Sequence, residues 1–206
     1  DDAMKKTLIA AAAGLVAVTA LAGHHEKGEK AAEAETAMMS EEAMMAAMAA
    51  AATPGEPHAR LAESVGTFDA AMTFLMDPSG EPQKTTMTVE RTMDLGGRVM
   101  LEHWSGEFMG MPFAGRSRTG YDNVTKRYWS TWTDNWSTGV LVMYGDYDAE
   151  SESMVFKGEN AHPVTGSMYT MKSVARELGD GQSIMDMYED YGQGMVKAFT
   201  VTMTPR

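Results

Sequence analysis

The chain has 206 residues, a formal net charge of −12 and no cysteine. Because an acidic chain without a basic stripe repels a phosphate backbone, we expect no nucleic-acid partner. The absence of thiols excludes disulfides, thiolate metal sites and cysteine nucleophiles, and the length suits one domain with a full core.

Residues 4–22 have the pattern of a secretory signal peptide. Lys5 and Lys6 provide its positive start, an apolar run follows, and the segment ends in a small-x-small cleavage pattern at Ala22. The apolar run is too short for a membrane-spanning helix. We therefore expect a periplasmic or secreted protein, cleaved after Ala22 and without a stable membrane anchor. Residues 1–3 precede the expected initiator Met4 and read as an upstream remnant.

Residues 23–55 consist mostly of Ala, Glu, Lys and Met, a low-complexity composition that cannot bury enough apolar surface to fold alone. We interpret this segment as a tether. Part of it has helical features. Ser40 can cap a helix that runs to Ala52, and Glu41 and Glu42 are favourable at the N-terminal end of such a helix.

From residue 56 onward the pattern predicts one domain. Residues 56–65 read as a short helix that Gly66 ends, and after it side chains alternate with the period of a strand. The first predicted strand contains residues 68–76. Nine more follow at 84–93, 98–108, 112–121, 127–134, 138–147, 153–159, 167–176, 183–191 and 196–204. Ten short strands separated by turns predict an all-β fold, as an antiparallel barrel or sandwich.

Three stretches resemble the bacterial family catalogued as domain of unknown function 1579. They are PGEPHARLAESVGTFDAAMTF, DLGGRVMLEHWSGEFMGMPFAGRSRTGYDNVTKRYWSTWTDNWSTG and the terminal TVTMTPR. The resemblance covers residues 54–206 and implies a lipocalin-like, up-and-down closed barrel with a helix at one end. It carries no established activity. Lipocalin-like barrels begin their first strand with Gly-x-Trp, and an arginine near the end of the barrel packs over the Trp. In this chain Gly66 and Phe68 stand at the Gly and Trp positions, and Arg206 stands at the position of the arginine. The axial histidine of haem-binding relatives has no counterpart, because no histidine follows His162.

A closed barrel of this size has an interior that is either filled by side chains or open to one small molecule. Aromatic side chains and two carboxylates on the expected inner faces are the candidate ligand-binding residues. They are Phe74, Glu102, Trp104, Tyr121, Trp132, Asp134, Tyr144 and Phe199. The alternative interpretation is that the apolar members simply pack the core.

Glu102 shares a strand face with Trp104, and Asp134 shares one with Trp132. If the tryptophans point inward, the interior holds two carboxylates that could bind a cation, orient a polar group or act as acid and base. The alternative is that both carboxylates lie at the rim, paired with Arg91, Arg116 or Arg118. No G-x-S-x-G motif supports a serine hydrolase.

Imidazole and thioether groups in the tether suggest a second function, since both can bind Cu(I). The candidate metal ligands are His24, His25, Met44, Met45 and Met48. Low-complexity composition explains the presence of the same residues without a metal site.

The leading hypothesis is a non-enzymatic, lipocalin-like barrel that binds a small, largely apolar molecule and needs no cofactor. Copper binding by the tether and an enzyme using carboxylates in the barrel are the alternatives.

Overall fold

The computed structural model describes residues 40–75 and 80–206. The chain divides into two units, residues 1–48 and 49–206, and helix α3 (Glu41–Ala52) crosses the boundary between them. The predicted signal segment and most of the predicted tether lie outside the described residues. Within the described ranges, no helix has both the length and the apolar character that crossing a membrane requires.

Helix α3 begins where the sequence predicts. Ser40 Oγ accepts a hydrogen bond from the backbone N–H of Ala43 at 3.2 Å, and two glutamates occupy the first turn. Its last turn belongs to the second unit, where Arg98 donates two hydrogen bonds to the Ala52 carbonyl, at 3.0 and 2.6 Å. A cation is favourable at this end because it faces the negative pole of the helix.

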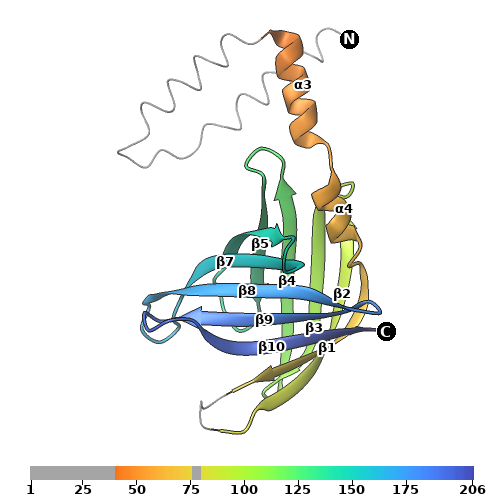
Figure 1. Ribbon diagram of the computed structural model, residues 1–206. Coiled ribbons are helices and arrows are strands. Elements are labelled where there is room, and N and C mark those ends of the chain that lie inside the picture. The colour runs from red at the N-terminus through yellow and green to blue at the C-terminus, as the bar shows by residue number, and fades with distance from the viewer. Residues whose placement is uncertain (1–39, 76–79) are drawn as a thin grey trace. The chain divides into compact units, whose positions relative to one another are not determined.

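Residues 66–205 form ten antiparallel strands (Figure 1). The strands are β1 (Gly66–Phe74), β2 (Gln83–Asp94), β3 (Val99–Phe108), β4 (Met111–Asp122), β5 (Arg127–Asp134), β6 (Leu141–Asp148), β7 (Ser153–Ala161), β8 (Met168–Gly179), β9 (Gln182–Asp190) and β10 (Val196–Pro205). Each pairs with its neighbours in sequence, and β1 pairs with β10. The sheet is therefore a closed up-and-down barrel, which confirms the predicted fold class and all ten strands.

Strand β5 illustrates how the sequence sets the two faces of the wall. Tyr128 is buried, and Ser130 and Trp132 line the barrel interior. Trp129 and Thr131, which alternate with them, lie in a shallow groove on the outside. The period of two along a strand produces this division.

Two clusters of buried side chains form the core. One gathers Phe68, Val89 and Trp104 with their neighbours from β1, β2, β3 and β10. The other joins Leu61 of helix α4 (Glu56–Ala62) to buried residues of β3 and β5–β9. Because every strand pairing and both clusters lie inside residues 49–206, we expect this part of the chain to fold on its own.

Helix α4 is fixed to one end of the barrel by three side chains besides Leu61. The His58 ring stands edge-on to Tyr121 with centroids 5.9 Å apart, and Tyr128 donates its hydroxyl to the Pro57 carbonyl at 3.2 Å. Arg60 lies 3.7 Å above the centre of the Tyr147 ring. Burial, opposed by the nearby Arg60 cation, raises the pKa of the Tyr128 hydroxyl.

Candidate functional site

The barrel encloses a cavity of about 1500 Å³. Its lining runs from Arg60 and Leu61 of α4, at one end, to Trp136 in the β5–β6 connection at the other. All ten strands contribute side chains to the lining. Side chains therefore do not fill the interior, and the barrel has room for a small molecule.

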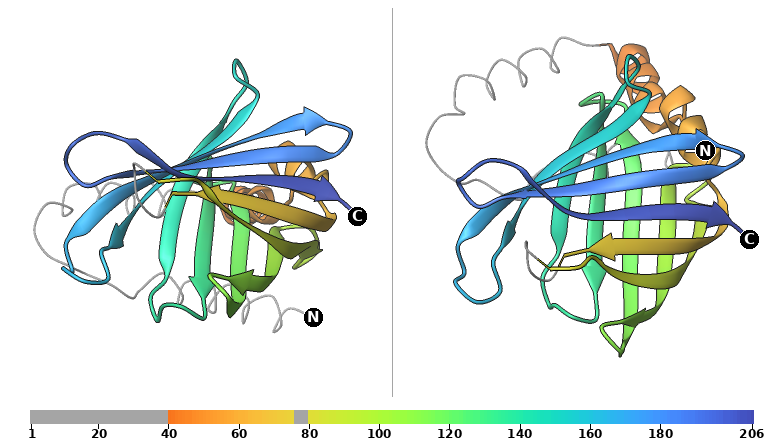
Figure 2. Two further views of the ribbon diagram at one scale, coloured as in Figure 1. Left: turned by 90° about the horizontal axis from the view of Figure 1, so that it is seen from below. Right: turned by 60° about the horizontal axis from the view of Figure 1, so that its bottom comes forward.

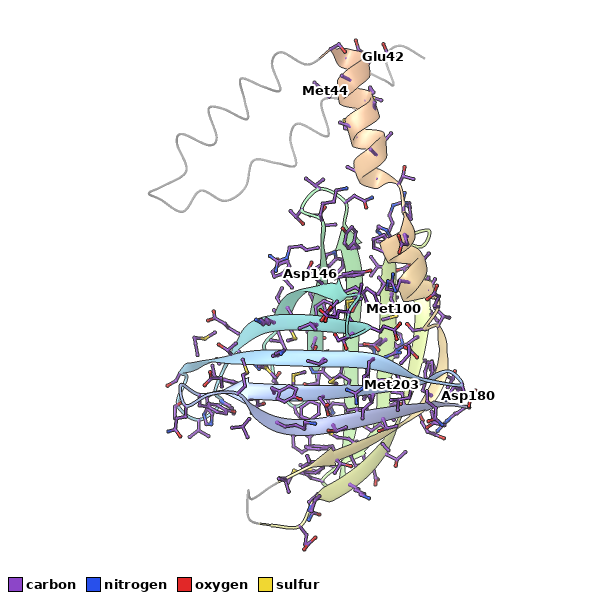
Figure 3. All side chains as sticks on the ribbon, in the orientation of Figure 1. Glu42, Met44, Met100, Asp146, Asp180 and Met203 are labelled. Carbon is purple, nitrogen blue, oxygen red and sulfur yellow. The ribbon has the colours of Figure 1, made fainter. Side chains whose placement is uncertain are left out.

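Methionine is the most frequent side chain around this cavity. Nine line it: Met72, Met87, Met100, Met143, Met154, Met171, Met185, Met187 and Met203. Met100 and Met203 belong to β3 and β10 (Figure 3). An unbranched thioether rotates about three bonds and adapts to irregular shapes, so such a wall can adjust to different apolar surfaces.

Aromatic rings gather at the end of the cavity away from α4. Phe108 is central, with its ring centre 5.0 Å from that of Phe74, 5.1 Å from Trp136 and 6.2 Å from Phe113. Phe113 also stacks on Trp132 with centroids 6.3 Å apart. These rings come from β1, β3, β4, β5 and the β5–β6 connection, and all of them line the cavity.

Gly115 makes room for the Trp132 indole on the inner wall. A Cβ at position 115 would collide with the Trp132 ring, because the indole lies directly against the glycine backbone. Trp132 is also held by its Nε1–H, which donates to Asp134 Oδ2 at 2.7 Å. The ring therefore lies along the wall and leaves the centre of the cavity open.

The two predicted carboxylates both line the cavity, and both are engaged. Glu102 Oε1 accepts a hydrogen bond from Arg91 Nε at 2.7 Å, and each side chain of this ion pair is only 12% exposed. Asp134 accepts from Trp132 and from the backbone N–H groups of Trp136 and Ser137, at 2.9 and 3.0 Å. Glu102 thus has the predicted arginine partner, but inside the barrel rather than at its rim. Neither carboxylate is arranged as an unengaged acid or base.

Hydroxyl groups form a polar strip beside the Arg91–Glu102 pair. Ser117 of β4 lies between Glu102 and Trp132 in register, and Thr119 donates its hydroxyl to Ser130 Oγ at 3.1 Å. All three hydroxyl side chains line the cavity. The wall formed by β3, β4 and β5 can therefore hydrogen-bond a polar group. The wall formed by β8, β9 and β10 contributes four methionines, Phe199 and Val201, and also Ser173, Ser183, Arg176 and Glu177.

Trp104 carries a buried N–H group for which no partner exists among the described residues. The side chain is 5% exposed and stands edge-on to Trp132, with ring centres 5.7 Å apart. An unpaired buried donor is costly to a fold. Its position beside the cavity makes the β3 wall the part of the barrel with unused hydrogen-bonding capacity.

The structure places six of the eight candidate residues in the cavity lining: Phe74, Glu102, Trp104, Trp132, Asp134 and Phe199. Tyr121 packs under α4 against His58 and Tyr128, outside the lining. The inward placement of Tyr144 is wrong. It is 47% exposed on the outer face, under the Arg127 guanidinium, because β6 turns Leu141 and Met143 inward and Tyr144 has the opposite parity.

The expected pairing of Arg206 with Phe68 is also wrong. Arg206 binds Asp69 and donates to Thr88 Oγ1 at 2.8 Å, both on the outer face. Arg91 takes the place beside Phe68, with its guanidinium carbon 5.2 Å from the ring centre. An arginine does therefore pack against the Gly66-Thr67-Phe68 start of β1, but β2 supplies it.

The list of candidate ligand-binding residues from the sequence contains none of the nine methionines that line the cavity. Met154, Met171 and Met185 line the cavity, as does Arg91. Strand parity could have found Met185, since it shares a face with Met187 on β9.

The tether residues proposed as copper ligands are described only in part. Met44, Met45 and Met48 lie on α3, where Met45 is 47% and Met48 is 37% exposed. His24 and His25 lie outside the described residues. Within residues 40–75 and 80–206, no group of three or more His, Cys, Asp or Glu side chains could hold a metal ion.

Comparison with known proteins agrees with the extent of the barrel. The model of a family described as protein of unknown function (DUF1579) matches residues 53–206, which include α4 and all ten strands. No curated protein matches the chain. The match covers well over half of the sequence and agrees with the resemblance drawn from its motifs. The chain belongs to the DUF1579 family.

Proposed function

We propose that the barrel of residues 49–206 is a non-enzymatic carrier or receptor that binds one small, largely apolar molecule in its interior. The observation that supports this most directly is the cavity of about 1500 Å³ lined by nine methionines and a group of aromatic rings. A cavity of this size exceeds the few hundred to about 1000 Å³ common for ligand sites, so an extended molecule fits it. The secretory pattern of residues 4–22 supports a periplasmic or secreted location.

The distribution of polar groups supports a ligand with one hydrogen-bonding group. Ser117, Thr119 and Ser130 stand together on the β4–β5 wall, beside the Arg91–Glu102 pair. The methionine-rich wall on β8–β10 offers dispersion contacts, and its charged lining residues, Arg176 and Glu177, are confined to the last part of β8. A molecule with an apolar body and a hydroxyl, carbonyl or ether group would satisfy both walls. An ion would not, because no unpaired charge of opposite sign faces it from the polar strip.

Saturable binding of a neutral, environment-sensitive apolar dye tests the proposal. Residues 49–206 should increase the emission of the dye and lose tryptophan emission with the same midpoint, since Trp104 and Trp132 line the cavity. A flat titration of folded protein would refute the proposed function.

Two variants of neighbouring residues locate the dye. Ser130→Trp places an indole in the cavity, whereas Thr131→Trp places it on the outside of the same strand. We expect Ser130→Trp to weaken dye binding about tenfold or more by filling the space, and Thr131→Trp to leave it unchanged. Equal effects of the two substitutions would place the dye outside the barrel.

A further inference from the structure

The two ends of the barrel differ in charge. In an up-and-down barrel alternate connections lie at the same end. At the α4 end, the β2–β3, β4–β5, β6–β7 and β8–β9 turns each contain charged residues, among them Arg98, Lys126, Glu152 and Asp180. Figure 3 shows Asp180 at the side where the C-terminus lies.

Of the five connections at the opposite end, β1–β2 contains Asp77 and Glu81, and the other four carry no Asp, Glu, Lys or Arg. These are β3–β4, β5–β6, β7–β8 and β9–β10. Across the whole chain, 22% of residues are charged, so the difference is large. Figure 2 shows these turns on the side of the barrel away from α4.

Each of these connections instead exposes a large apolar or aromatic side chain. We call this set the apolar rim: Met109, Trp136, Val140, Val164, Tyr191 and Met195. Val164 is 86% exposed and Met109 is 51% exposed. Solitary apolar residues on a surface need no explanation, but one or two on each of these four connections, with no charge among them, do.

Polar groups behind the rim hold these loops in place. Asp134 accepts the N–H groups of Trp136 and Ser137, and Asp190 Oδ1 accepts those of Gly192, Gln193 and Gly194 at 2.7 to 3.0 Å. His162 Nδ1 accepts from Val164 and Thr165 at 3.2 and 3.3 Å. These hydrogen bonds fix the conformations of the β5–β6, β7–β8 and β9–β10 connections, in which the rim side chains are partly or largely exposed.

The rim adjoins the lining of the cavity. Trp136 belongs to both, since it lines the cavity and is 42% exposed, and Pro163, next to Val164, also lines the cavity. An occupant of the rim would therefore lie next to this end of the cavity.

We propose that the apolar rim docks reversibly on the surface of a neutral or zwitterionic lipid layer. The charge pattern favours this partner, because the rim has no cation to attract anionic headgroups and the chain as a whole carries −12. Trp136 and Tyr191 are the side chains that settle at a lipid–water interface. A lipid layer that covers the rim would also supply apolar molecules next to this end of the cavity. The supply of ligand from the lipid layer rests on the proposed function.

Flotation of residues 49–206 with phosphatidylcholine vesicles tests the docking. We expect the protein to float with the vesicles equally at low and high salt, because no ion pair contributes. Val164→Asp combined with Met109→Asp should lower the vesicle-bound fraction about tenfold. The matched control, Leu95→Asp with Val124→Asp, changes equally exposed residues at the charged end and should float like the unchanged protein.

Dye binding without vesicles separates the two proposals, since the rim variant should still bind dye in its cavity. Failure of the unchanged protein to float, or equal flotation of the rim and control variants, would overturn lipid docking while leaving ligand binding standing. A rim-dependent dimer in light scattering, with no flotation, would assign the rim to a second copy and also overturn it.

Discussion

Arg91 and Glu102 meet inside the barrel, Nε to Oε1 at 2.7 Å, and the remaining side of the guanidinium contacts Met203 Sδ at 3.0 Å. A charge pair in these surroundings is stable only as a pair, because each partner alone would be a charge buried against thioether and aromatic groups. The pair joins β2 to β3 and forms the charged end of the polar strip in the cavity.

Removal of one partner of this pair should destabilise the protein more than removal of both. We expect Glu102→Gln to lower the free energy of unfolding by about 3 to 5 kcal/mol, and Arg91→Met with Glu102→Leu to recover most of it. Urea unfolding measures both. Asp69→Asn is the control, since its pair with Arg206 is about half exposed and should contribute about 0 to 1 kcal/mol. A single variant as stable as the control would contradict the prediction.

Gly115→Ala should move the Trp132 indole into the cavity. The added methyl group collides with the ring, so we expect a loss of about 1 to 3 kcal/mol in stability and weaker dye binding. Tryptophan emission and dye titration report the two effects. Gly139→Ala serves as the control, because a Cβ there meets no atom within 4 Å. If both alanine variants bound dye like the unchanged protein, the proposed role of Gly115 would be wrong.

Leu61→Ala should loosen α4 from the end of the barrel. Leu61 is 6% exposed and packs in the core cluster of β3 and β5–β9, so truncation should cost about 2 to 5 kcal/mol. Val65→Ala changes a side chain that is 44% exposed and should cost about 0.5 kcal/mol or less. Thermal unfolding and hydrogen exchange in residues 56–62 measure the difference. Equal costs would mean that α4 contributes little to the core.

Acid should remove the contribution that two aspartates in turns at the α4 end make to the stability of the fold. Hydrogen bonds from Thr125 and the Val124 N–H lower the pKa of Asp122 below 3.8, and Ser151 with the Glu150 N–H does the same for Asp148. A carboxyl whose folded pKa lies below its unfolded value stabilises the fold above the unfolded pKa and loses that effect as pH falls through the folded one.

Urea midpoints measured from pH of about 5 down to about 2 should therefore fall less steeply in Asp122→Asn with Asp148→Asn than in the unchanged protein. Asp146→Asn, the same change of carboxylate to amide on the outer face of β6, serves as the control. A double variant with the original slope would show that the two turns do not account for the acid sensitivity.

The periodicity of the sequence was sufficient for the all-β class and the ten strands, and the family resemblance supplied the closed barrel. Alternation such as that of Tyr128, Ser130 and Trp132 against Trp129 and Thr131 is a local property of a strand, and ten such runs between turn residues have few compact solutions other than an antiparallel barrel or sandwich. The start of α3 at Ser40 is local in the same sense, because capping involves residues three apart.

Tertiary structure alone decided which face of a strand points inward, and which distant partners meet. Tyr144 lies in a strand that follows a loop, and the length of that loop determines whether Tyr144 points inward or outward. The sequence does not show where the loop ends, so the outward position of Tyr144 could not be predicted from it. Phe68 received Arg91 rather than Arg206 because the β1–β2 register, not the order of residues, determines which cation lies over the ring. The open cavity and the apolar rim arise in the same way, since both depend on side chains from many strands being brought around one axis.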